Sequence, residues 1–447
     1  MFSFKFLGKT HIPHHKNTAD MPAVRMSSPK EVLLPMAQHI GAPATPIVKI
    51  GDEVKLGQRI ADPTGFVSSP IYASVSGKVS KIEEYLRPDG SKVQAVRIVS
   101  DGQMQAFEGL TPPTVDSLDA LIEAVKESGL VGLGGAGFPT AVKLGALKGG
   151  KVDKIVVNGA ECEPFITSDT RTMLDNIDLI REAVALFERF APSVKQFIFG
   201  VEANKPSAIA KLKEAFAQND KVVVKKLPAR YPQGAEKVLV YNTTGLVIPE
   251  GKLPADVGAI VINVTTLAVL ASYVKTGMPL VERTVTVDGS AVKAPKNVIA
   301  PIGTSLAEIV EFAGGYVEPI GKALVGGPMM GKCAASLDEP ITKTTGSILL
   351  FNVKDSEEKQ SSNCIHCGRC VTSCPLALNP VEYSRALDYD SREERIAILK
   401  REKIMLCMEC GCCSYVCPAK RPLVQNNVLA KAQYRAYLAE QKAKEQK

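Results

Sequence analysis

Two copies of one cysteine spacing near the C-terminus constrain this chain most strongly. Each copy reads C-x-x-C-x-x-C-x-x-x-C-P. Three thiolates on one tight loop can hold three irons of a [4Fe–4S] cube, and the fourth cysteine of such a run crosses to the other cluster. The runs therefore predict one cluster on Cys364, Cys367, Cys370 and Cys417, and a second on Cys407, Cys410, Cys413 and Cys374.

This cysteine rhythm is that of bacterial ferredoxins, and it predicts electron transfer. Zinc modules are the alternative, but they favour two separated C-x-x-C pairs. Gly368 and Gly411 let each loop backbone approach the cluster closely. Of the other cysteines, Cys412 is expected to be a buried bystander and Cys333 a structural residue, whereas Cys162 receives no role.

Cysteine usage and charge restrict the cellular setting. Eight of the 11 cysteines lie in the two runs, which indicates a reducing compartment. The net charge of +7 favours an acidic redox partner and does not indicate nucleic-acid binding. Residues 1–10 lack a signal-peptide pattern. The apolar stretch 257–274 is interrupted by polar side chains, so we expect a buried strand over 258–264 followed by a buried helix. Because the cysteines must stay reduced, we expect the chain on the cytoplasmic side.

Residues 1–275 divide into two modules by their pattern. Residues 1–100 contain short strands broken by turns such as Gly51-Asp52, which predicts a small β-rich module. Residues 117–275 alternate helices with apolar strands, which predicts an α/β domain. Its expected elements are a helix over 118–126 and strands over 154–157, 196–199 and 222–224.

The second half of the chain adds two further modules, so the fold class is multidomain α/β. Residues 281–350 predict an α+β module of β-grasp size with a helix near 305–313. A polar linker then leads into the two-cluster, ferredoxin-like α domain, residues 360–425. Residues 426–447 form a charged helical tail that we expect to be solvated or partly disordered.

Residues 132–137 contain the pattern G-x-G-x-x-G. A Rossmann site needs a strand immediately before these glycines, but here a helix precedes them. The Gly-Lys-Ser/Thr ending of a P-loop is also missing. A turn packed for structural reasons is the alternative, although so many glycines are costly unless the backbone must approach something.

The glycine-rich segment and a second segment after it together resemble a known family. Gly134-Gly135-Ala136-Gly137-Phe138-Pro139-Thr140 with Lys143, followed by Asn158-Gly159-Ala160-Glu161-Cys162-Glu163-Pro164, resembles the flavin-binding subunit of respiratory complex I. The resemblance implies non-covalent FMN with NADH stacked over it. Glycine amides and the Lys143 ammonium suit a flavin phosphate, and Asn158 can hydrogen-bond the flavin.

The same resemblance implies the remaining site residues. Those implied to bind the cofactor are Gly134, Gly135, Ala136, Gly137, Lys143, Asn158, Tyr231, Gly234, Glu236, Asn263 and Thr266. Those implied to meet NADH are Glu161, Glu163 and Phe138. The alternatives are solvated acids and a core phenylalanine. The chain departs from that family at Ala160, Cys162, Phe165 and Ala235.

Two resemblances concern the rest of the chain. Gly51-Asp52-Glu53-Val54 and Ser69-Pro70 resemble the biotinyl/lipoyl barrel-sandwich family, but no lysine lies between Lys55 and Lys78 to serve as a swinging arm. An N-terminal Lys9-Thr10-His11-Ile12-Pro13, together with all these modules, is similar to the C subunit of the Rnf family over residues 4–423. His11, His14 and His15 are weak zinc candidates without further ligands.

The Rnf resemblance implies a peripheral subunit on the cytoplasmic face of the cell membrane. It implies electron transfer between ferredoxin and NAD(H) through two [4Fe–4S] clusters and non-covalent FMN. Partner subunits, membrane-embedded and of the ferredoxin-type B kind, would translocate Na⁺ or H⁺. A flavin must connect NADH with the clusters, because nicotinamide exchanges two electrons and a cluster passes one. The alternatives are a cobalamin reductase of propanediol-utilising microcompartments and a flavin-free ferredoxin-like carrier.

Overall fold

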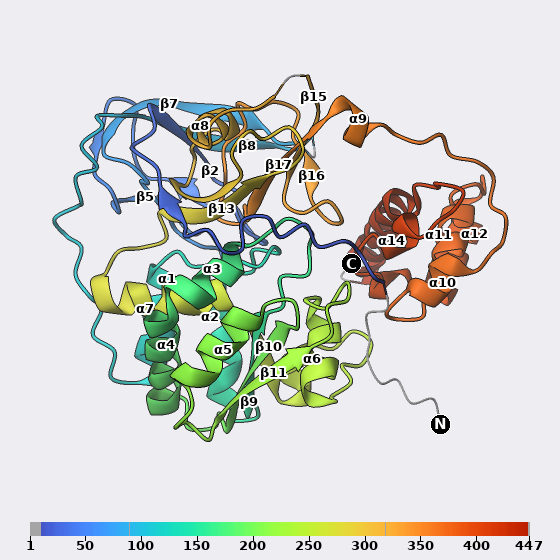
Figure 1. Ribbon diagram of the computed structural model, residues 1–447, viewed down its shortest axis with the longest axis horizontal. Coiled ribbons are helices and arrows are strands. Elements are labelled where there is room, and N and C mark those ends of the chain that lie inside the picture. The colour runs from blue at the N-terminus through green and yellow to red at the C-terminus, as the bar shows by residue number, and fades with distance from the viewer. Residues whose placement is uncertain (1–9, 89, 318, 446–447) are drawn as a thin grey trace.

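The computed structural model describes residues 10–88, 90–317 and 319–445 (Figure 1). Two β-rich modules lie above an α/β domain, and a helical lobe stands to one side. The N-terminal segment runs along the boundary between the β modules and the α/β domain towards the lobe. The first nine residues, including Lys9, lie outside the described residues.

The first module is the predicted barrel sandwich, built of two facing antiparallel sheets. Alternate residues of the central strands, such as Val32, Leu34, Val96 and Ile98, are fully buried between the sheets. The larger sheet has the order β2 (Glu31–Pro35), β8 (Lys92–Ser100), β7 (Gly77–Leu86) and β4 (Glu53–Val54). The smaller sheet has the order β3 (Thr45–Pro46), β5 (Arg59–Asp62) and β6 (Ile71–Tyr72).

The second module is a four-stranded parallel sheet covered by helices, as predicted. Its central strands are almost continuously apolar because helices cover both faces. The strand order is β11 (Val222–Leu227), β10 (Gln196–Glu202), β9 (Lys154–Gly159) and β12 (Ala259–Asn263). The helices are α1 (Leu118–Glu127), α2 (Thr140–Leu144), α3 (Ser168–Asp175), α4 (Ile177–Phe190), α5 (Pro206–Ala215), α6 (Glu236–Thr244) and α7 (Val264–Thr276).

The third module is a mixed sheet with one helix packed on it. Leu306, Ile309 and Val310 of α8 (Leu306–Phe312) pack against the buried face of the sheet. The strand order is β1 (Val24–Arg25), β14 (Lys296–Pro301), β13 (Glu282–Asp288), β17 (Ser347–Asn352), β15 (Ile320–Val325) and β16 (Lys332–Cys333). Strand β1 belongs to the N-terminal segment that precedes the barrel sandwich, and it pairs in parallel with β14 of this sheet.

A buried lysine joins these three modules. The Lys343 ammonium donates hydrogen bonds to Ser69 Oγ (3.1 Å), the Pro70 carbonyl (2.6 Å) and the Gly129 carbonyl (2.7 Å). Burial lowers the pKa of Lys343 to about 7. The three oxygens compensate in part for this desolvation, so the modules pack in one defined arrangement around the ammonium.

The helical lobe contains both cysteine runs and ends in a long helix. It follows the short α9 (Val353–Ser356) and comprises α10 (Arg369–Ser373), α11 (Pro380–Ala386), α12 (Arg392–Arg401), α13 (Cys412–Tyr415) and α14 (Leu423–Glu445). The tail after residue 425 is helical, as expected, and most of its residues are exposed. It is not solvated on every side, because Asn427, Ala430, Lys431 and Tyr434 are buried against the lobe.

In the described part of the chain, no helix has both the length and the apolar composition required to cross a membrane. The apolar stretch near residue 260 forms β12 and α7, within one residue of the predicted strand and helix.

We expect α14 to be required for cluster retention. Deleting residues 426–447 removes the buried Ala430 and Tyr434, and a large buried side chain contributes about 1.5–3 kcal/mol. Iron analysis of anaerobically purified protein should give clearly fewer than about eight atoms per chain. Deleting only residues 441–447 is the matched control and should leave iron unchanged. Full iron content in the longer deletion would contradict this role.

Candidate flavin and iron–sulfur sites

The parallel sheet has a topological switch point between β9 and β12. The chain proceeds from β9 to β10 on one side, whereas β12 lies on the other. Asn158 and Asn263, at the carboxyl ends of these strands, are direct neighbours in register. Crevices at such points are where open α/β sheets bind ligands, so the structure brings these two predicted residues to one site.

The glycine-rich loop contacts these strand ends through Asn263 and Thr266, and we call this strand-end site the flavin crevice. Its ends are joined by a hydrogen bond from Gly132 N to Phe138 O (2.8 Å). Leu133 N donates to Thr266 Oγ1 (2.9 Å), and Arg283 of β13 donates to Leu133 O (3.1 Å). Burial lowers the pKa of Arg283 to about 10. Sequence reasoning missed Arg283, because it lies in another module.

The glycines of the loop differ in what a side chain at each position would contact. A Cβ on Gly134 would lie 3.2 Å from the Asn263 side chain, and one on Gly137 would lie 2.6 Å from Thr344 Cγ2. Gly135 instead has φ +133° and open space in front of it. Packing thus explains Gly134 and Gly137, whereas exposed Gly135 and Ala136 leave a backbone cradle that a ligand can approach.

Asn263 connects the crevice to helix α7. Its side-chain oxygen accepts a hydrogen bond from Thr266 N (3.1 Å) and caps the helix. Its amide nitrogen donates to Asp169 Oδ2 (2.7 Å). The helix N-terminus and the loop amides favour an anion, so the residues present fit the phosphate of a flavin mononucleotide.

Lys143 and Glu236 pair with each other beside the crevice. The Lys143 ammonium lies 3.2 Å from Glu236 Oε1 and donates to Val261 O (2.8 Å). Both side chains are partly exposed. Their contact with a cofactor stays a prediction.

Asn158 connects the end of β9 to the loop that carries Gly234. Its amide nitrogen donates to Gly234 O (2.9 Å), and Gly234 N donates to Cys162 Sγ (3.3 Å). Burial raises the pKa of Cys162 to about 12, so this thiol is neutral at neutral pH. Cys162, which had no role by sequence, therefore holds the loop that carries Tyr231 and Gly234.

The two glutamates expected to meet NADH have partners inside the protein. Glu161 accepts hydrogen bonds from Asp169 N (2.6 Å) and from Thr170 Oγ1 (2.5 Å), at the start of α3. Burial raises its pKa to about 7. Glu163 accepts from Met329 N (3.0 Å) and Tyr231 OH (3.3 Å). Direct contact of either carboxylate with nicotinamide stays a prediction, as does that of the partly exposed Phe138.

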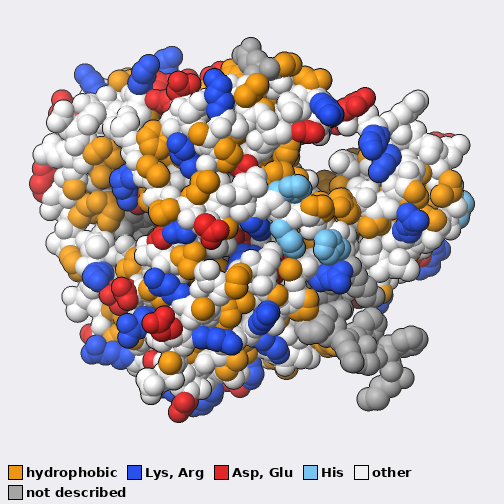
Figure 2. Space-filling view, in the orientation of Figure 1, with side chains coloured by type: hydrophobic (Ala, Val, Ile, Leu, Met, Phe, Trp, Pro, Cys, Tyr) orange, Lys and Arg blue, Asp and Glu red, His pale blue; other side chains and the backbone are white. Residues whose placement is uncertain are grey.

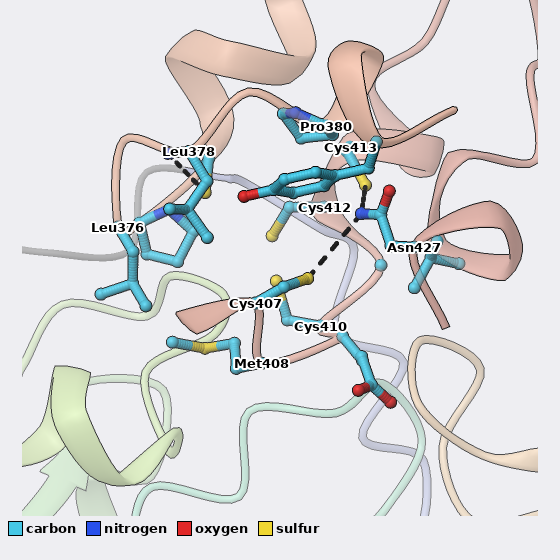
Figure 3. A pocket seen from close by; sticks show the side chains of 15 residues that line it. Leu376, Leu378, Pro380, Cys407, Met408, Cys410, Cys412, Cys413 and Asn427 are labelled. Atoms are coloured by element: carbon cyan, nitrogen blue, oxygen red, sulfur yellow. Dashed lines mark hydrogen bonds between the residues drawn. The ribbon is translucent and has the colours of Figure 1, made fainter. Parts of the chain in front are cut away.

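The eight predicted ligand cysteines line two cavities in the crossed arrangement. Cys374 lies with Cys407, Cys410 and Cys413 around one cavity, which also contacts the bystander Cys412 (Figure 3). The other cavity, about 230 Å³, is lined by Cys364, Cys367, Cys370 and Cys417. Each run thus sends its fourth cysteine to the other set, and each set of four cysteines has the composition that a four-iron cluster requires.

The two cavities differ in their surroundings. Cys410 and Cys412 pack against Tyr231 and Ile12, next to Met329. The cavity of Cys407, Cys410, Cys413 and Cys374, which we call the inner cluster site, therefore borders the flavin crevice. The outer cluster site, formed by Cys364, Cys367, Cys370 and Cys417, is open, since Cys367 is exposed and Ile365 is 65% exposed.

Histidines gather at the junction between the body and the lobe (Figure 2). The rings of His11 and His14 lie 6.2 Å apart, and that of His15 stacks on Phe165 at 4.9 Å. Among the residues that the structure describes, no three His, Cys, Asp or Glu side chains form a site for a single metal ion. The face of the lobe that is visible in Figure 2 carries Lys and Arg side chains.

Family models match all four modules. They are the RnfC barrel sandwich hybrid domain (residues 4–103), the Nuo51 FMN-binding domain (125–272), the SLBB domain (284–332) and the 4Fe-4S dicluster domain (360–421). The structure of an NAD⁺-reducing [NiFe]-hydrogenase in the air-oxidized state shares the fold, with a TM-score of 0.51 and 19% identity. The match covers 72% of this chain and 63% of that one.

Curated relatives match most of the chain. The C subunit of the proton-translocating ferredoxin:NAD(+) oxidoreductase complex of Clostridium ljungdahlii is 44% identical, covering 84% of this chain and 82% of its own. The C subunit of the Na(+)-translocating complex of Acetobacterium woodii is 42% identical, covering 88% and 90%. Neither the cobalamin reductase nor the flavin-free carrier is favoured by these matches. The chain belongs to the family of C subunits of ion-translocating ferredoxin:NAD oxidoreductase (Rnf) complexes.

Proposed function

We propose that this chain transfers electrons between NAD(H) and its partner subunits in the order FMN, inner cluster, outer cluster. The observation that carries the proposal is the position of Tyr231, which donates a hydrogen bond to Glu163 and packs against Cys410 of the inner cluster site. Because one-electron transfer needs neighbouring centres, this contact supports the flavin as the step between NADH and the inner cluster.

The residues of the crevice hold the flavin in this proposal. The exposed amides of Gly135 and Ala136 and the N-terminus of α7 receive the phosphate, with Lys143 as a nearby cation. Asn158 and Asn263, neighbours at the strand ends, would hold the ring system. FMN supplies the exchange between a two-electron hydride and single electrons.

Glu161 and Glu163 act as positioning residues in this proposal. Glu161 caps α3, and Glu163 ties the same loop to Met329 of the third module. They keep the loop between flavin and inner cluster in place, and the partly exposed Phe138 is the side chain that we propose meets NADH.

The outer cluster site supports a docking role towards other Rnf subunits. Exposed Arg369 and Lys420 flank its cysteines, and Glu382, the acid that lines the cavity, pairs with Arg385. A basic rim around an exposed redox centre favours an acidic electron carrier. We place the chain as a peripheral subunit on the cytoplasmic face of the membrane, held by those partners.

Gly135→Val should lower the FMN content of the purified protein. The β-branched side chain would fill the open space in front of the loop, at a φ of +133° that such residues avoid. FMN released by acid would be quantified per chain, with iron content as the check on folding. Gly145→Ala, at a glycine with helical φ and open surroundings, should retain full FMN. Equal FMN content in the two variants would contradict the proposal that the backbone at Gly135 binds the FMN phosphate.

Glu161→Ala should depress NADH oxidation with ferricyanide by at least about tenfold, because loss of the cap lets the loop move. Glu161→Gln keeps an oxygen for Asp169 N and should retain most of the rate. Anaerobic NADH titration of the wild type should bleach flavin and clusters. If NADH fails to reduce fully loaded wild-type protein, this chain is not the nicotinamide site.

Arg369→Glu combined with Lys420→Glu should slow electron transfer from a reduced small acidic [4Fe–4S] ferredoxin to the oxidised chain by at least about tenfold at low salt. Turnover with a neutral quinone acceptor should not change. The matched control is Lys442→Glu with Lys444→Glu, the same charge change about 30 Å away along α14. An equal loss in both pairs would show that only net charge matters and would reject the docking face.

A further inference from the structure

Helix α14 places a side-chain amide against two thiols of the inner cluster site. Asn427 Nδ2 lies 3.7 Å from Cys407 Sγ and 3.8 Å from Cys413 Sγ, as the dashed lines in Figure 3 show. The asparagine is 1% exposed, so water does not compete for these contacts. Residue 427 was assigned by sequence to a tail outside the cluster domain.

Packing alone does not explain an asparagine at this position. Its neighbours on the buried face of α14 include Leu423 and Ala430, and its side-chain oxygen has no partner among the described residues. Burying a half-satisfied amide costs free energy that a leucine would not incur. Cluster thiolates carry no proton and can only accept hydrogen bonds, so the NH₂ group is the side that must face them.

Lys431, one turn further along α14, keeps this geometry in place. Its ammonium donates to the Cys407 carbonyl (2.5 Å) and lies 2.9 Å from Glu409 Oε1. The lysine is 7% exposed. Asn427 and Lys431 thus hold the ligand loop from one helix face, since residues four apart lie on the same side.

The outer cluster site has a different environment. The sulfur contact there comes from a backbone amide, His366 N to Cys364 Sγ (3.4 Å), on an exposed loop. No side-chain amide contacts its four sulfur atoms among the hydrogen bonds of the described residues. A change at Asn427 therefore acts on one cluster and not on the other.

We propose that Asn427 raises the reduction potential of the inner cluster through hydrogen bonds to Cys407 and Cys413. Reduction adds one negative charge to the cluster, and N–H dipoles directed at its thiolates stabilise that charge. When NADH is oxidised, the electron comes from the reduced flavin, whose position rests on the proposed function. Asn427 is a positioning residue that acts through the ligands, and it makes the inner cluster a better acceptor.

The test is a redox titration of the anaerobic holoprotein, followed by electron paramagnetic resonance with a chemical reductant in place of NADH. Asn427→Leu should lower the inner-cluster potential, so that its reduced-to-oxidised ratio at a fixed potential falls threefold to tenfold; tenfold corresponds to about 59 mV. The outer-cluster signal should not move. Asn426→Leu is the matched control, because Asn426 donates to Ser384 Oγ (2.7 Å) and not to a thiol.

Two further variants assign the signal to one cluster and separate the loss of the hydrogen-bond donor from a change of side-chain shape. Cys374→Ser identifies the inner-cluster signal, since it removes a ligand of that cluster alone. Asn427→Asp, which has the same shape without the donor, should shift the potential in the same direction as Asn427→Leu. Unchanged potentials in both Asn427 variants at full iron content would overturn the proposal. So would an equal shift in Asn426→Leu, or loss of the inner cluster in both Asn427 variants, which would assign Asn427 to assembly.

Discussion

The loop of residues 160–166, which follows β9, is held by the ammonium groups of partly buried Lys16 and buried Lys205, and the arrangement of the redox sites depends on it. Lys16 donates to the carbonyls of Glu161, Glu163 and Ile166. Lys205 donates to Ala160 O and pairs with buried Glu202. Burial lowers the pKa of Lys16 to about 8, so the carbonyls must compensate for a desolvated charge. The loop can therefore present Cys162 and Glu163 between the flavin crevice and the inner cluster site.

Contacts between modules, more than any single module, create the electron path. The third module contributes Arg283 to the glycine loop and Met329 to the inner cluster site. The N-terminal segment contributes Ile12 to the same junction. The relevant side chains are desolvated there, which strengthens each polar contact and makes each unpaired group costly.

Much of the fold could be predicted because its signals are local. The cysteine spacing predicted both ligand sets, since three thiolates on one loop require a short fixed interval. Apolar runs predicted β9, β10 and β12 to within a few residues. The tail after residue 425 was correctly expected to be helical, but its packing against the lobe was not, because its many charges hide the pattern of the buried face formed by Ala430 and Tyr434.

The sequence by itself determined the cofactor chemistry: ligand spacing and backbone freedom at glycine are properties of short segments. Only the tertiary structure decided which cluster borders the flavin crevice, that Glu161 and Glu163 have internal partners, and that Asn427 contacts ligand thiols. These depend on side chains from separate modules meeting in a desolvated junction. No local pattern specifies such contacts, because the free energy that selects them comes from packing between segments distant in the chain.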